Sequence, residues 1–119
     1  MTDPAAIRAY HAHVYYRDAD ERARAAELRD AVEGNFEVTF GRWRDEPVGP
    51  HPLPMCQISF AAHNLAEFIP WLMLNRRDLT ILIHPVSGDD VADHRDHPFW
   101  MGESLDLDIG FLEAGNTNA

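Results

Sequence analysis

Histidine is the residue type in this chain that is best placed to do chemistry. Neutral imidazole is a common metal ligand, and its unperturbed pKa lets it exchange protons near neutral pH. Alternate residues of a β-strand share a face, so His11 and His13 can direct two imidazoles at one point. His51 lies between two prolines, and His84 ends the apolar run that starts at Leu79. The other three histidines are His63, His94 and His97.

Convergence of several histidines would indicate a metal site. Imidazoles that are buried together repel one another when protonated, and a divalent metal removes that cost. Imidazole suits zinc, copper, iron and nickel, and Fe(II) oxygenases commonly add one carboxylate to two histidines. The candidate carboxylates are Asp89, Asp93 and Glu103, although we expect Asp93 to cap a turn. A solvated surface position remains the alternative for each histidine, because no short ligand pair such as H-E-x-x-H is present.

Composition restricts the class of protein. The 119 residues suit one domain, which we place at residues 1–119, and 45% hydrophobic with 25% charged residues is typical of a globular chain. No segment approaches the about 20 consecutive apolar residues of a membrane span. A formal charge of -10 argues against binding to nucleic acid or to anionic membranes. The single cysteine, Cys56, excludes an internal disulfide, and with an N-terminus that lacks a secretory pattern it favours a cytoplasmic location.

The hydrophobic pattern predicts alternating strands and helices. Asp18 or Asp20 can cap a first helix that ends at Gly34. Asn64 with Glu67 forms a capping-box signature for a second helix. Pro70 should either kink this second helix or mark its first residue. We expect strands at 7–16, 36–44, 55–61, 79–84 and 104–111, loops at 45–54 and 86–98, and a frayed tail at 113–119.

This order of elements predicts an α+β fold of the ferredoxin-like kind. The split βαββαβ arrangement gives an antiparallel sheet with helices on one face, here with an extra C-terminal strand. The other face is then free to hold a ligand or a second subunit, and we expect a homodimer. In this topology His11, His13, His51 and His84 can converge on the uncovered face.

Four motifs occur in a specific order along the chain. They are His11-x-His13-Val14-Tyr15-Tyr16, then Gly49-Pro50-His51-Pro52, then Asn75-Arg76-x-Asp78-Leu79-x-Ile81-Leu82-Ile83-His84-Pro85, then Asp93-His94 with Trp100-Met101-Gly102. In these motifs the chain resembles the DOPA 4,5-dioxygenase family over about residues 10–107. The resemblance implies a single DOPA-dioxygenase-like domain on a ferredoxin-like, dimer-prone fold. It also implies extradiol cleavage of a catechol such as DOPA or caffeate by non-haem Fe(II) and O2, with zinc as a conceivable substitute metal.

The resemblance also suggests roles for individual residues. His11, His13, His51, His84 and His94 match the recurring histidines of the family, whereas His63 and His97 match none. We expect His11, His13, His51 and His84 to bind the metal, and His94 with Tyr15 to be catalytic, His94 as an acid or base. Candidate substrate-binding residues are Arg42, Arg76 and Trp100, with Arg77 as a further candidate cation.

One position departs from the family pattern, and two other functions stay open. Arg77 stands where relatives often have glycine in Asn-Arg-Gly, which bears on substrate preference. The first alternative is a non-catalytic protein that binds zinc or copper through the same histidines. The second is a cofactor-free, monooxygenase-like dimeric α+β barrel protein.

Overall fold

The expected α+β fold is confirmed by the structure, a computed structural model that describes residues 1–116. A five-stranded antiparallel sheet has the strand order β2-β3-β1-β4-β5, which is the ferredoxin-like order with β5 added at one edge. Its elements are β1 (Ala9–Tyr15), α1 (Ala19–Asn35), β2 (Thr39–Phe40), β3 (Met55–Ala61), α2 (Leu65–Asn75), β4 (Ile81–Pro85), α3 (Asp90–Arg95), β5 (Phe99–Met101) and α4 (Ile109–Glu113). Short 3-10 helices occur at Pro4–Ala6 and Ala62–Asn64.

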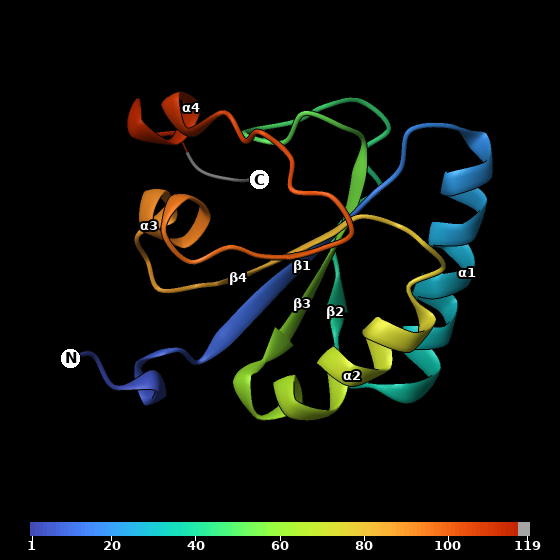
Figure 1. The fold of residues 1–119 in the computed structure, drawn as a ribbon, viewed down its shortest axis with the longest axis horizontal. Helices are drawn as coiled ribbons and strands as arrows, with labels where there is room; N and C mark the ends of the chain where they lie inside the picture. The colour runs from blue at the N-terminus through green and yellow to red at the C-terminus, as the bar shows by residue number, and fades with distance from the viewer. Residues whose placement is uncertain (117–119) are drawn as a thin grey trace.

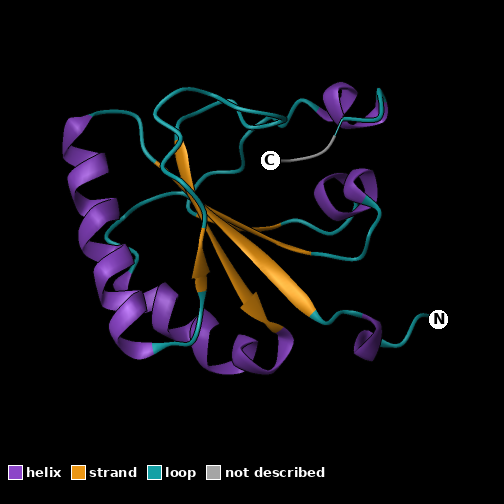
Figure 2. Ribbon diagram, turned by 180° about the vertical axis from the view of Figure 1, so that it is seen from behind, coloured by secondary structure: helices purple, strands orange, loops and turns teal. Residues whose placement is uncertain are grey.

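The sheet separates two layers of different character (Figures 1 and 2). The long helices α1 and α2 lie on one side, as expected, and α3 and α4 lie on the other side. Between the sheet and the long helices is the main apolar core, formed by buried residues that include Val14, Leu28, Val32, Ile58, Phe68 and Leu72. The second face is therefore not open, because α3, α4 and two irregular segments cover part of it.

Strand register decides which side chains face the second layer. His11 pairs with Ser59 and His84, and His13 pairs with Gln57 and Leu82. Since Ala12 and Val14 belong to the main core, His11, His13 and Tyr15 point to the opposite face, as the alternation predicts. A small apolar cluster of Tyr15, Met55 and Leu82 lies on that face, beside the histidines.

The two segments that cover this face differ in how well the sequence predicted them. Residues 45–54 form a loop, as expected from their prolines, and Val48 and Leu53 pack on the Tyr15 cluster. The predicted strand at 104–111 is wrong: Leu105 and Leu107 pack on the same cluster without pairing to a strand, and Asp108 caps α4 by accepting from the Phe111 amide. The partial burial of alternate residues, Leu105 and Leu107, imitated the pattern of a strand here. The extra strand is β5 instead, which pairs with β4.

Other element boundaries also differ from the predictions. The predicted loop 86–98 contains α3, whose first turn is capped by Asp89. The second strand is reduced to two residues and an isolated bridge between Arg44 and Met55. Asn64 does not cap α2, because it already has a helical backbone and its side chain donates to the Glu37 carbonyl. Pro70 neither begins nor ends α2, which runs through it.

The tail that the sequence predicts as frayed begins at Glu113, but Glu113 is the last residue of α4. Residues 117–119 of this tail lie outside the described residues. Within residues 1–116, no helix is long and apolar enough to cross a membrane.

Arg77, which departs from the family motif, occupies a turn that suits glycine. Its φ is 59°, in the left-handed region that costs other residues roughly 1–2 kcal/mol, and its side chain pairs with the exposed Glu27. We expect Arg77→Gly to be more stable than Arg77→Ala by about 1 kcal/mol, because both variants lose the ion pair and only glycine relieves the backbone. Urea unfolding of the two variants measures this difference, and an alanine variant of equal stability would contradict it.

Candidate metal centre

Five of the seven histidines meet on the second face of the sheet. His11 and His13 come from β1, His84 from β4, His94 from α3, and His51 from the proline-bounded loop. Their ligand atoms form two overlapping triads, His11-His13-His84 and His13-His51-His94, within each of which the nitrogens lie within 4.8 Å of one another. His13 belongs to both triads and is fully buried. By contrast, His63 and His97 are exposed, as expected.

One pair of imidazoles, His13 and His84, has the spacing of two ligands of one metal. His13 Nε2 and His84 Nε2 are 3.0 Å apart. Two nitrogens bound at about 2.0–2.1 Å and at right angles around one ion are separated by about 3 Å. His84 Nδ1 donates to the Pro85 carbonyl at 2.8 Å, so in the neutral ring Nε2 carries the lone pair that a metal requires.

His94 lies inside the cluster and on helix α3, so the loop that the sequence predicts around it at 86–98 is wrong. It is buried, and its ring centroid is 4.1 Å from that of His84. Its Nδ1 donates to the Asp90 carbonyl at 2.6 Å, which leaves Nε2 unprotonated in the neutral ring. The preceding residue, Asp93, is also buried and accepts from the amide and the hydroxyl of Ser87, as expected for a turn. This contact fastens α3 to the end of β4.

Tyr15 contacts the cluster through His51. The Tyr15 hydroxyl and His51 Nδ1 form a hydrogen bond of 2.7 Å, and both residues are buried. Burial raises the pKa of Tyr15, so the hydroxyl stays protonated. When His51 Nδ1–H donates to the hydroxyl oxygen, Nε2 is free to bind a metal, which is how an outer partner usually orients a histidine ligand.

Tyr15→Phe should therefore weaken metal binding by about 10- to 100-fold, the usual effect of removing a hydrogen-bond partner of a ligand. The ring that packs in the apolar cluster is retained. Competition with a chelator measures the affinity. Tyr16→Phe is the matched control, because its hydroxyl donates to Asp45 on the other face of the sheet. Equal affinities of the two variants would show that the Tyr15 bond does not orient a ligand.

Burial favours the neutral form of His11, His13 and His84, which is the form that binds metals. Desolvation is the main cause that lowers the pKa of His11, lowers that of His13 well below 6.5, and lowers that of His84 to about 3. Repulsion by neighbouring imidazoles adds to the effect in all three. The cluster is thus prepared to receive a cation and resists protonation.

The same shifts predict that acid destabilises the metal-free protein. The unfolded chain binds protons at these histidines near pH 6.5, whereas folded His84 binds one only near pH 3. The free energy of unfolding should fall below pH 6.5 by up to about 1.4 kcal/mol per pH unit for each such histidine. Melting temperatures at pH 7.0 and 5.5, where most carboxylates stay ionised, test this. A melting temperature that is equal or higher at pH 5.5 would contradict it.

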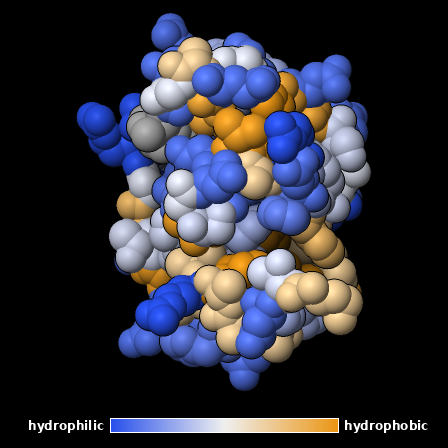
Figure 3. Space-filling model, turned by 90° about the vertical axis from the view of Figure 1, so that its left-hand side faces the viewer, coloured by the Kyte–Doolittle hydropathy of each residue, from blue (hydrophilic) through white to orange (hydrophobic). Residues whose placement is uncertain are grey.

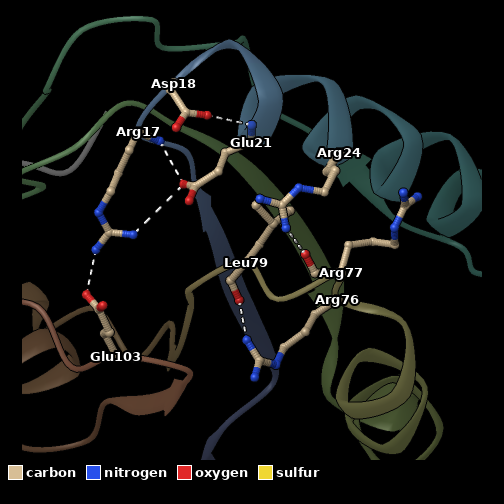
Figure 4. A network of polar contacts seen from close by, with 8 residues as sticks. All are labelled: Arg17, Asp18, Glu21, Arg24, Arg76, Arg77, Leu79 and Glu103. Carbon is tan, nitrogen blue, oxygen red and sulfur yellow. Dashed lines mark hydrogen bonds and ion pairs between the residues drawn. The ribbon is translucent and has the colours of Figure 1, made fainter.

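The donor set of the cluster consists of imidazoles. The three carboxylates considered from the sequence are engaged elsewhere: Asp93 bonds to Ser87, Asp89 caps α3, and Glu103 pairs with Arg17 at 2.5 Å (Figure 4). His11 Nδ1 is buried and has no hydrogen-bond partner among residues 1–116. An unsatisfied buried nitrogen in a set of neutral imidazoles fits a transition metal such as iron or zinc.

A pocket of about 230 Å³ opens beside His94. Its walls are mostly apolar and include Pro98, Trp100, Leu105, Leu107 and Ile109, and Arg95 and Asp106 add charged groups. The Trp100 ring is stacked on Tyr15, with centroids 6.1 Å apart. Trp100 is therefore near the cluster, as expected for a substrate-binding residue. The sequence did not indicate that Leu105, Asp106 and Leu107 line a pocket, because their alternation is also typical of a strand.

The two candidate arginines lie outside this pocket. Arg76 donates to the Leu79 carbonyl at 2.7 Å, which stabilises the turn before β4 (Figure 4). Arg42 is exposed and lines a separate small hollow with Gln57 and Met55. Arg77 is exposed and pairs with Glu27. The structure gives no support to a substrate-binding role for these arginines.

Comparisons with known proteins find relatives of this chain by sequence and by structure. The model of the Dopa 4,5-dioxygenase family matches residues 10–111. A crystal structure from Nostoc punctiforme, described as a "putative dioxygenase", superposes with a TM-score of 0.93 at 45% identity and covers 98% of this chain and 100% of its own.

Two fungal relatives are longer than this chain. An uncharacterized 21.2 kDa protein of Botryotinia fuckeliana is 33% identical over 88% of this chain and 63% of its own length. The DOPA 4,5-dioxygenase of Amanita muscaria is 34% identical over 89% of this chain and 50% of its own length. The chain thus spans between half and two thirds of these curated relatives, and the family model covers most of the chain. The chain belongs to the Dopa 4,5-dioxygenase family.

Proposed function

We propose that this protein is an extradiol dioxygenase that cleaves a catechol such as DOPA or caffeate at a non-haem Fe(II) ion. The observation that carries the proposal is the cluster of five histidines, in which two Nε2 atoms are already at the spacing of ligands. Bound iron would supply Lewis acidity toward the catechol oxygens and reactivity toward O2. Both oxygen atoms of O2 enter the ring-opened product, so no external reductant is required.

The sheet triad offers the firmest place for the metal. His11, His13 and His84 lie on paired strands, and β1 and β4 hold them in register. We assign the metal to these three residues, with His51 as the fourth ligand, because its ring lies 4.1 Å from that of His13 and Tyr15 orients it. Zinc would fit the same nitrogens.

His94 and Trp100 face the space where the substrate would lie. Both line the pocket beside the cluster, so the aromatic ring of a catechol can pack on Trp100 while its hydroxyls approach the histidines. A catechol that binds through both oxygens must lose protons. His94, whose Nδ1 is engaged by the Asp90 carbonyl, is the proposed base through Nε2, whereas Tyr15 acts by holding His51.

Reconstitution of the anaerobically purified protein tests the proposal. The protein is loaded with Fe(II), with Zn(II) or with no metal, and O2 uptake and formation of a yellow ring-opened product are followed with DOPA and caffeate. Turnover only with iron is the expected result. Turnover without metal would indicate the cofactor-free class, and tight metal binding without turnover of any catechol would indicate a metal-binding protein. A homodimer and a cytoplasmic location belong to the proposal, and light scattering in solution tests the dimer.

A further inference from the structure

The chain's negative charge is concentrated in the segment that covers the histidines. Residues 86–116 contain eight acidic residues and one arginine, a formal charge of -7 out of -10 for the whole chain. This segment includes α3, β5 and α4, and it supplies all the residues that line the pocket beside His94. Figure 3 shows the side of the molecule that carries α3 and α4, where polar residues predominate and apolar residues appear in the hollows.

The single arginine of this segment is already neutralised. Arg95 Nε and Nη2 each donate to an oxygen of Asp96 at 2.8 Å, which is a bidentate pair. Asp89 and Glu113 are also close enough to raise the pKa of Arg95. A substrate carboxylate in the pocket would meet a guanidinium whose charge Asp96 already compensates, which weakens its attraction for a second carboxylate.

The other charged group of the pocket has no such partner. Asp106 lines the pocket between Leu105 and Leu107, and it forms no hydrogen bond or ion pair within residues 1–116. Arg17 also contacts this segment, but it pairs with Glu103. The pocket therefore combines apolar walls for a ring with one exposed, unpaired carboxylate, in a strongly negative segment.

From this arrangement we infer that the preferred substrates are catechols with a cationic amine on the side chain, and that Asp106 selects them. The inference rests on the proposed function, because it assumes that the ring oxygens face the histidines. The ammonium group then meets Asp106, and a catechol with a carboxylate side chain meets the same carboxylate and is repelled. The net charge of the segment attracts the amine before it binds, and this attraction weakens as salt is added.

Three catechols with side chains of similar length test the inference: dopamine, 4-ethylcatechol and 3-(3,4-dihydroxyphenyl)propionate. With the iron-loaded protein at low salt we expect kcat/KM to fall in that order, with about a tenfold ratio of amine to acid. Half-molar salt should compress this ratio. Asp106→Asn should lower the ratio of amine to ethyl compound by about threefold. Asp30→Asn, which removes the same charge from α1 on the other face of the sheet, should change the ratio little.

Binding provides a second measurement that does not depend on turnover. Dissociation constants for the zinc-loaded protein should rise in the order amine, ethyl compound, acid, so that the amine binds most tightly, whether or not the iron-loaded protein turns the catechols over. If the ethyl compound is cleaved but the acid is preferred, or if Asp106→Asn changes the ratio no more than Asp30→Asn, the inference is wrong while the proposed function stands. If nothing is cleaved but the amine binds best through Asp106, the charge selection stands and the proposed function fails.

Discussion

His13→Ala should abolish metal binding. The affinity should fall by more than about 100-fold, which is the largest effect usually seen when only a hydrogen-bond partner of a ligand is removed. His13 is fully buried and is the residue that the two histidine triads share. Whichever triad holds the ion, this substitution removes one of its nitrogens. Titration with Co(II) or Zn(II), followed by absorbance or by competition with a chelator, measures the loss. Turnover should be lost with the metal.

Two further variants decide between the triads. His84→Ala removes a ligand from the sheet triad only, and His94→Ala removes one from the other triad only. Our assignment predicts that His84→Ala loses metal and that His94→Ala keeps it. Retention of metal by His84→Ala together with its loss from His94→Ala would place the ion between His13, His51 and His94.

The control for these variants is the exposed His97, whose replacement by alanine should leave the affinity unchanged. Removal of a buried side chain can also lower stability through the cavity that it leaves. Melting of each metal-free variant separates this effect from loss of the site, and His13→Gln provides a better-filled variant with the same expected result.

His94→Ala should keep the metal and lower kcat by about 10²- to 10⁴-fold, the range that general acid or base catalysis contributes. His94 is held through Nδ1 by the Asp90 carbonyl, and it lines the pocket beside Trp100. A proton acceptor at this position shows in the pH dependence, so the variant should also lose the acidic limb of the rate profile.

The substitution of His94 should affect substrate binding less than the reaction rate. KM for the catechol should change less than kcat, because His94 is proposed to act on the proton rather than to anchor the ring. A variant that loses rate with an unchanged pH profile would contradict a proton-transfer role, even if the metal is kept. Phenylalanine at position 94 gives a second variant that fills the buried space with a ring lacking nitrogen.

The sequence by itself determined the alternating elements and the direction of the strand side chains. The period of two in β1 predicts that His11, His13 and Tyr15 share one face, and the register confirms it. Prolines identified the loop that carries His51, and the apolar run identified β4 with His84 at its end. These features follow from local rules, since side-chain alternation and the effect of proline depend only on neighbouring residues.

Only the tertiary structure decided what covers that face. The sequence pattern of Leu105 and Leu107 is the same whether a segment pairs as a strand or packs as an irregular cover, so it was interpreted wrongly. His94 entered the cluster because α3 is fastened to β4 through Asp93 and Ser87, a contact between polar residues that no periodicity predicts. Likewise, the sequence does not show that Arg76 donates to the Leu79 carbonyl of a turn. Nor does it show that Arg95, and not Arg42, lines the pocket. Local sequence fixes which way a side chain points along its element, whereas the meeting of side chains from different elements depends on packing.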